Sequence, residues 1–132
     1  MQFLCREIDR NVMLVEVDGG LDATTSAQFT DALEKMIDVG IDRIIVDCDR
    51  LHYVSSAGIA TLLRLHKRMH RRGGEVKLAS VRGLVFDVLR AMKLDEVFNV
   101  YADVERARLA LRPRDDGNDR RRDDKAGRDE SS

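Results

Sequence analysis

The feature that most constrains the fold is a repeated alternation between short apolar runs and longer segments that are apolar on one side only. Residues 3–8 and 12–17 alternate between apolar and polar side chains, as surface strands do, and the polar residues 9–11 between them predict a hairpin turn. Residues 44–48 and 76–79 are almost continuously apolar, which indicates strands covered on both faces. Strands of this kind need helices to cover them.

Four segments have the spacing of amphipathic helices. The first follows the glycine pair at 19–20, which we expect to end the second strand, and its candidate N-cap residues are Asp22, Thr24 and Thr25. The second begins at Ser55-Ser56-Ala57-Gly58, and the fourth covers residues 102–111 after a last strand at 97–101. The third helix takes its amphipathic character from Leu84, Val85, Val88, Leu89 and Met92.

The resulting order of elements is β-β-α-β-α-β-α-β-α, which predicts an α/β fold. Strand–helix–strand units give a mixed, mainly parallel sheet with right-handed crossovers, and we expect the first strand to add as an antiparallel edge. In such sheets, ligands and partners usually meet the loops at the carboxyl ends of the strands. The two segments at this position are residues 19–25 and 53–58.

The chain changes character at Arg112. Residues 112–132 contain seven basic and seven acidic residues, and Ala126 is their only aliphatic residue. Such a segment buries too little apolar surface to offset the entropy that it would lose on ordering. We therefore expect one domain at residues 1–111, followed by a disordered charged tail at residues 112–132.

Charge, hydropathy and cysteine content exclude several classes of protein. The net charge of −1 gives no uniform attraction to nucleic acid, and no apolar run approaches the roughly 18 residues that span a bilayer. We therefore expect neither direct nucleic-acid binding nor membrane insertion. The first residues lack the charged-then-apolar order of an export signal, so we expect Cys5 and Cys48 to be buried free thiols of a cytoplasmic protein.

The most informative segment is Tyr53-Val54-Ser55-Ser56-Ala57-Gly58-Ile59. Two hydroxyl groups stand where a helix begins, and a helix N-terminus presents unpaired N–H groups with a partial positive charge. Such a position accommodates a phosphoryl group well. The small residues Ala57 and Gly58 allow another protein or a nucleotide phosphate to approach closely. The alternative interpretation is that Ser55 only caps the helix and that Ser56 fills space.

This segment resembles the signature of the STAS domain, and specifically that of bacterial anti-sigma factor antagonists, which is typically aromatic-aliphatic-Asp-Ser-Ser/Thr-Gly-Leu. Residues 17–22 are similar to the family's loop before the first helix, and residues 84–98 are similar to its late helix and final strand. The resemblance covers residues 1–111. The chain departs from the pattern at Ser55, where the family usually has Asp, and at Ala57, which replaces the second Ser or Thr.

The resemblance implies a binding module that is not an enzyme and uses no cofactor or metal. Such an antagonist binds an anti-sigma factor, which is also a serine kinase of the histidine-kinase-like ATPase fold, and binding frees a sigma factor for transcription. Phosphorylation by the kinase ends the interaction, and a phosphatase reverses it. Matched to this chain, the phosphorylated residue is Ser56, with Ser55 as the alternative acceptor, and the partner-binding residues are Asp22, Ser55, Ser56, Ala57 and Gly58.

Two other functions remain open at this point. One is a STAS domain that acts without a kinase, as an interaction subunit of a lipid transporter or as part of a signalling scaffold. The other is an enzyme with Ser56 as the nucleophile and His52 four residues before it. The sequence contains no Gly-x-Ser-x-Gly motif, which argues against the second function.

Two pairs of metal-ligand residue types also stand close together in the sequence. His66 and His70 have a spacing that can bind a metal, and Asp47 with Asp49 could bind Mg²⁺ at the end of a strand. The neighbours of the two histidines are basic, so a solvated basic face explains them more simply. Capping and solvent exposure explain the two aspartates in the same way.

Overall fold

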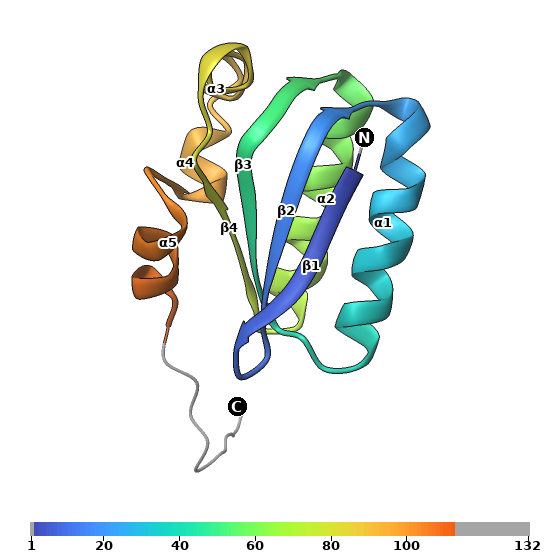
Figure 1. Cartoon of the computed structure of the whole chain (residues 1–132), viewed down its shortest axis with the longest axis vertical. Coiled ribbons are helices and arrows are strands. Elements are labelled where there is room, and N and C mark those ends of the chain that lie inside the picture. Colours follow the sequence, from blue (N-terminus) through green and yellow to red (C-terminus); the bar gives the residue numbers. More distant parts are fainter. Residues whose placement is uncertain (1, 113–132) are drawn as a thin grey trace.

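The computed structural model describes residues 2–112. Its elements in chain order are β1 (Gln2–Asp9), β2 (Val12–Leu21), α1 (Ala23–Asp38), β3 (Arg43–Val54), α2 (Ser56–Arg71), β4 (Glu75–Ala79), α3 (Gly83–Ala91), α4 (Asp95–Phe98), β5 (Val100–Tyr101) and α5 (Val104–Ala110). This confirms the α/β class (Figure 1). The order of elements is the predicted one, with the short helix α4 added.

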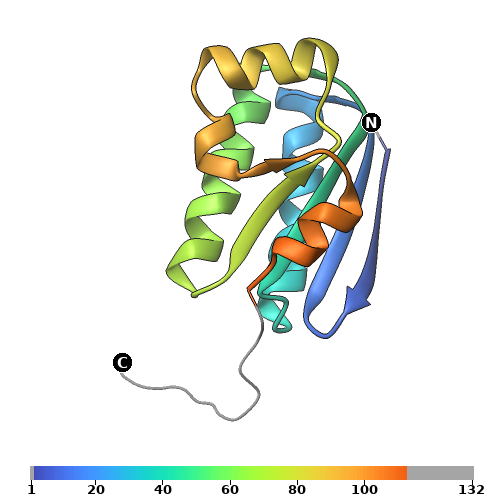
Figure 2. The ribbon, with the colours of Figure 1, turned by 90° about the vertical axis from the view of Figure 1, so that its left-hand side faces the viewer.

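The strands lie in the sheet in the same order as in the chain, β1-β2-β3-β4-β5. β1 pairs antiparallel with β2 at one edge, and the other neighbouring strands pair in parallel, as predicted. α1 and α2 cover one face of the sheet, and α5 lies on the opposite face, in front of the sheet in Figure 2. The carboxyl ends of the parallel strands β2 and β3 therefore lie next to each other, and α1 and α2 begin directly after them.

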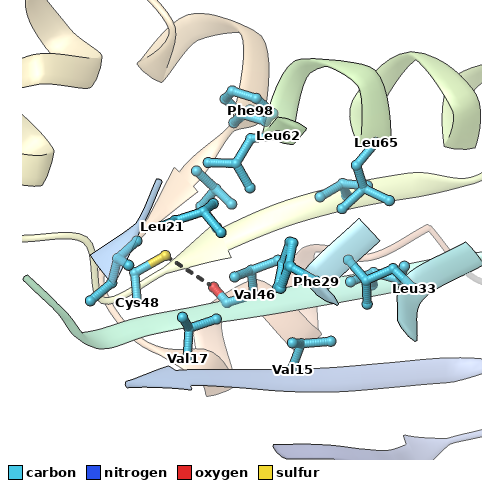
Figure 3. Close-up of a cluster of buried hydrophobic side chains, with 14 of the residues drawn as sticks. Val15, Val17, Leu21, Phe29, Leu33, Val46, Cys48, Leu62, Leu65 and Phe98 are labelled. Atoms are coloured by element: carbon cyan, nitrogen blue, oxygen red, sulfur yellow. Dashed lines mark hydrogen bonds between the residues drawn. The ribbon is translucent and has the colours of Figure 1, made fainter. Parts of the chain in front are cut away.

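The main core lies between the sheet and the helices α1 and α2. Phe29 of α1 and Leu62 of α2 belong to one buried cluster with Val15 of β2 and Val46 of β3 (Figure 3). Cys48 is buried in the same cluster, where its Sγ atom donates to the carbonyl oxygen of Val46 at 3.6 Å. Burial raises the pKa of the Cys48 thiol to about 12, so this sulfur acts as an apolar filler.

The two cysteines differ in burial, contrary to the expectation that both are buried. Both are free thiols, but Cys5 on β1 is only partly buried. Its side chain packs against the main core from the edge strand, and partial burial raises the pKa of its thiol. An edge strand has no neighbour on one side, so a side chain there keeps more contact with water than one on β3.

The two strands that lead to the predicted binding segments are longer than expected. β2 continues through Gly19 and Gly20 to Leu21, so the glycine pair does not end the strand. Gly19 has a φ of 116°, and the pairing with β3 shifts register between the two glycines. Glycine reaches this conformation without a Cβ clash, so the irregularity is absorbed within the strand. β3 likewise continues to Val54.

The segment predicted as a strand at residues 97–101 is partly helical. α4 ends at Phe98, Asn99 adopts a left-handed φ of 54°, and only Val100 and Tyr101 form β5. Asparagine tolerates this conformation better than most residues because its short side chain can hydrogen-bond locally. Phe98 is fully buried, so the apolar residue that suggested a strand belongs instead to helix packing.

α5 covers part of the second face of the sheet. Ala107 packs there in a small buried cluster that includes Ile45 and Ala79. Arg112, the last described residue, donates its backbone N–H to a carboxylate oxygen of Glu75 at 2.9 Å. The rest of the expected tail, residues 113–132, lies outside the described residues. Across residues 2–112, no helix combines the length and the apolar character needed to cross a bilayer.

Candidate functional site

The two predicted partner-binding segments lie side by side at the carboxyl ends of β2 and β3 (Figure 1). In the parallel ladder, Gly20 pairs with Tyr53 and Leu21 pairs with Val54. The backbone N–H of Ser55 then donates to the carbonyl oxygen of Leu21 at 3.0 Å. The ends of the two strands are therefore joined up to the residue that precedes α2.

Ser55 is the N-cap of α2. Its backbone is extended, with φ −92° and ψ 176°, and its hydroxyl oxygen accepts the backbone N–H of Gly58 at 3.2 Å. Ser and Asp are both strong N-cap residues because a side-chain oxygen satisfies a helix N–H that has no partner within the helix. The hydroxyl of Ser55 is therefore engaged in holding the start of α2.

Ser56 is the first residue of α2, and it is exposed. Its hydroxyl makes no hydrogen bond with any residue in the range 2–112. The N–H groups and the partial positive charge at the start of a helix favour a negatively charged group at this position. Ser56 thus presents an unengaged hydroxyl where a phosphoryl group is well accommodated.

Gly58 allows α2 to begin directly against the end of β2. A Cβ atom on residue 58 would lie 2.3 Å from the carbonyl oxygen of Leu21 and 2.8 Å from Cγ2 of Val54. Any larger residue must therefore displace the helix or the strand. Ala57, the residue before it, lines a groove between the starts of α1 and α2, together with the small side chains of Ala23 and Ala60.

Asp22 is the N-cap of α1, at the same edge of the sheet. Its carboxylate accepts the backbone N–H groups of Thr24 at 2.9 Å and Thr25 at 3.1 Å, and the Thr25 hydroxyl accepts the backbone N–H of Asp22 in return at 3.0 Å. The hydrogen bonds from Thr25 and Thr24 lower the pKa of the Asp22 carboxyl. Asp22 is therefore a fixed negative charge at the end of β2 at neutral pH.

A hollow borders Ser56 on the side of α3. The ring of Tyr53, 50% exposed, forms one wall and lies so close to Gly20 that a Cβ atom there would stand 3.3 Å from the ring. No residue that lines the hollow carries a charge at neutral pH. The lining residues are Tyr53, Val54, Ser55, Ser56, Ile59, Val88 and Met92.

The contribution of α3 to this site is absent from the sequence prediction. On α3, Val85 and Leu89 face the core, whereas Leu84 is 62% exposed and Met92, the C-cap residue of α3, is 53% exposed. The signal was present in the spacing of Leu84, Val88 and Met92, because residues four apart on a helix lie on one side of it. The sequence shows that the helix is apolar on two adjacent sides, but it does not show which side meets the sheet.

The other candidate residues do not assemble a site around Ser56. No hydrogen bond joins His52 to Ser56 in the described part of the chain. The rings of His66 and His70 stack at 6.2 Å, and His66 also lies edge-on to the ring of Phe98 at 5.5 Å. Burial, and then the neighbouring His70, lower the pKa of His66.

The two aspartates considered for Mg²⁺ have protein neighbours instead. Asp49 forms an ion pair with Arg82, and burial together with the nearby Glu16 raises the pKa of Asp47. Within residues 2–112, no group of three or more His, Cys, Asp or Glu residues could hold a metal ion.

Comparison with known proteins finds similarity along most of the chain. The family model described as "STAS domain" matches residues 5–107. BtrV of Bordetella bronchiseptica, which is named as a candidate anti-sigma factor antagonist, is 26% identical over 112 residues. That match covers 85% of this chain and 96% of BtrV.

Two solved structures have the same fold. TM1081 of Thermotoga maritima, described as a candidate anti-sigma factor antagonist, matches with a TM-score of 0.79 at 19% identity, over 84% of this chain and 95% of that one. SpoIIAA of Bacillus, in its phosphorylated form, matches with a TM-score of 0.69 at 20% identity, over 84% of this chain and 100% of that one. At these identities the likeness concerns the fold.

Proposed function

Because the chain belongs to the STAS domain family, we propose that it is an anti-sigma factor antagonist whose binding is switched off by phosphorylation of Ser56. The observation that carries the proposal is the free, exposed hydroxyl of Ser56 at the first position of α2. The name given to BtrV supports the function, and the phosphorylated form of SpoIIAA supports the modification. The partner is an anti-sigma factor, which binding removes from its sigma factor.

The partner-binding face includes Asp22, Ser55, Ser56, Ala57 and Gly58, at the carboxyl ends of β2 and β3. The small side chain of Ala57 keeps the surface low beside Ser56, so a partner backbone can approach closely, whereas Gly58 is buried against the end of β2 and holds the start of α2 in place. Asp22 adds a fixed negative charge that suits a basic group on the partner. This face is separate from α5, which lies on the opposite side of the sheet.

Ser56, and not Ser55, is the acceptor in this proposal. Ser55 is half-buried and its hydroxyl oxygen accepts the backbone N–H of Gly58 as the cap of α2, whereas Ser56 is exposed and its hydroxyl makes no hydrogen bond with residues 2–112. The family's usual Asp at this position is also a good N-cap. Ser55 therefore caps α2 in place of that Asp, and Ser56 remains the residue that accepts the phosphoryl group. Recognition by the kinase then depends on the free hydroxyl one residue later.

In this proposal the chain is the substrate of its partner and not an enzyme. The partner is a serine kinase of the histidine-kinase-like ATPase fold, which supplies ATP, Mg²⁺ and the catalytic base. The Oγ atom of Ser56 bonds to the γ-phosphorus, the bond from that phosphorus to the bridging oxygen breaks, the hydroxyl proton passes to the partner's base, and ADP leaves. A phosphatase reverses the modification, and all three proteins meet in the cytoplasm.

The test is a pull-down from the native cell extract with ADP or with ATP. Wild type, Ser56→Asp and Ser56→Ala serve as baits, and Leu109→Asp is the matched control because Leu109 is exposed on α5. We expect wild type and Leu109→Asp to capture an ATPase-fold anti-sigma factor with ADP and to release it with ATP. Ser56→Asp should not capture it, and Ser56→Ala should hold it with either nucleotide.

The opposite results reject the proposal. If Ser56→Asp captures the anti-sigma factor as well as wild type does, phosphorylation of Ser56 is not the switch. If wild type and Ser56→Asp both capture a transporter subunit or a scaffold protein equally, the chain is a kinase-independent STAS subunit. In that case Ser56 would only begin a helix.

A further inference from the structure

We propose that Leu84 and Val88 of α3 and its C-cap residue Met92, together with Tyr53, form an apolar docking surface beside Ser56, and that its occupant is an apolar patch of the anti-sigma factor. The inference rests on the proposed function and names the chemistry by which the partner is held. It also gives a physical account of the switch, because a phosphoryl group on Ser56 would stand at the border of this apolar surface.

Exposure and geometry identify the surface. Tyr53 is 50% exposed, Leu84 62% and Met92 53%, and all three are large apolar side chains. Val88 and Met92 line the same hollow as Ser56, so α3 and the start of α2 form its two sides. Leu84 extends the row by one further turn of α3. Burial of such a row against a partner is a large favourable contribution to binding.

No charged side chain lies within this apolar surface. The lining of the hollow contains no Lys, Arg, Asp or Glu. The polar residues of α3, Asp87 and Arg90, are exposed and lie farther round the helix. They therefore lie at the border of the apolar surface and not at its centre. The complementary partner surface is therefore apolar at its centre. A charged side chain of the partner that entered the hollow would be buried without an opposite charge beside it.

Two other occupants fit less well. Residues 113–132 contain Ala126 as their only aliphatic residue, so they offer no side chain to fill an apolar hollow. A second copy of this chain would cover Ser56 and shield it from a kinase. The anti-sigma factor must contact Ser56 in order to phosphorylate it, so it is the occupant that this surface fits.

The surface explains how a phosphoryl group would release the partner. Phosphoserine carries about −1.5 to −2 charges at neutral pH, and three strongly hydrated oxygens. The helix N-terminus stabilises this group while it faces water, but the residues that line the hollow include no cation to pair with it when a partner excludes the water. Desolvation then opposes docking, and the chain itself needs no change of shape.

The experiment measures the dissociation constant for the purified anti-sigma factor identified in the pull-down. Leu84→Lys, Leu84→Glu, Met92→Lys and Met92→Glu are compared with wild type, and Leu109→Lys and Leu109→Glu are the matched controls, because Leu109 is 72% exposed on the opposite face. We expect the four α3 variants to weaken binding about tenfold or more whichever charge is added, because either charge must be desolvated. The two controls should bind as wild type does. Melting temperatures check that every variant is folded.

Three results overturn the inference, and they are distinct from failure of the proposed function. Binding of both Leu84 and both Met92 variants within twofold of wild type, while Ser56→Asp still blocks capture, removes α3 from the interface and leaves the switch intact. Loss of binding for one sign of charge only means that charge, and not apolar burial, recognises the partner. A wild-type dimer that Met92→Lys dissociates, detected by analytical ultracentrifugation, makes a second copy the occupant. If wild type captures no anti-sigma factor at all, the proposed function fails and the inference fails with it.

Discussion

Gly58 lies against the carbonyl oxygen of Leu21 so closely that a Cβ atom on residue 58 would stand 2.3 Å from that oxygen. The same oxygen accepts the backbone N–H of Ser55 at 3.0 Å. One carbonyl group at the end of β2 therefore positions both the cap and the first turn of α2. The orientation of Ser56 follows from these two contacts, although Ser56 itself makes no hydrogen bond with the described residues.

Gly58→Ala should destabilise the protein by about 1–3 kcal/mol, because the added methyl group must push α2 away from β2. Urea unfolding followed by circular dichroism measures the change. Gly20→Ala is the matched control, since the nearest atom to a Cβ there is in the Tyr53 ring, at 3.3 Å, and the ring can move slightly. If the two variants lose the same free energy of unfolding, the close approach of α2 to β2 is not the reason for a glycine at position 58.

Ser55→Ala should lower the free energy of unfolding by about 1 kcal/mol, because the N–H of Gly58 loses its acceptor. Ser55→Asp should keep wild-type stability, since Asp caps helices as well as Ser does. Chemical denaturation of the three proteins in parallel provides the comparison. A stable Ser55→Ala variant would mean that the cap contributes nothing and would free Ser55 to act as the phosphoryl acceptor.

The stability of the protein should fall as the pH drops below about 6.5, in part through His66. Burial lowers the pKa of His66 below its ordinary value of about 6.5, so the unfolded chain takes up a proton more readily than the folded chain does. The contribution is fully present above the unfolded pKa and is lost as the pH falls through it. Urea midpoints between pH 8 and pH 5 measure the slope.

His66→Gln should flatten that slope, since glutamine does not titrate. His70→Gln should reduce it by less, because it removes only the smaller, electrostatic effect of His70 and leaves the burial of His66 against Phe98. A slope that is the same in wild type and His66→Gln would assign the pH dependence to other groups.

The two thiols should react at very different rates in the native protein. Burial raises the pKa of Cys48 to about 12 and also removes its sulfur from solvent, whereas Cys5 is partly exposed on an edge strand. At pH 8 a thiol reagent such as Ellman's reagent should modify one group per chain, and Cys5→Ser should abolish this fast reaction. Two fast groups in wild type would contradict the burial of Cys48.

The sequence was sufficient for the order and type of most elements because its patterns are local. Continuous apolar runs indicated β3 and β4, and the alternation at residues 3–8 indicated an edge strand; both interpretations are confirmed. The pair Gly19–Gly20 misled the prediction, since glycine is common both in turns and in irregular strands. Whether the glycine pair ends β2 depends on whether β3 continues to Tyr53 and pairs with Gly20. That pairing belongs to the tertiary structure and leaves no signal in the local sequence.

The candidate site divides in the same way. Ser55 was a possible cap from its residue type alone, and the structure gives it that role. The apolar hollow needed knowledge of which side of α3 meets the sheet, and Leu84 and Val85 are equally apolar in sequence. Packing of Val85 and Leu89 into the core decides this, and it leaves Leu84 and Met92 at the surface.

The order of the sheet has a consequence for how the chain folds during synthesis. Each strand pairs with the strand that precedes it in the chain, so no strand must be inserted between two that are already paired. A chain that leaves the ribosome from its N-terminus can add each strand to an existing edge, and every crossover closes a short loop of chain. The β1–β2 hairpin is then the template, and the site around Ser56 is complete only after α3 has docked. A nascent chain stalled before α3 would already display Ser56, but without the apolar surface beside it.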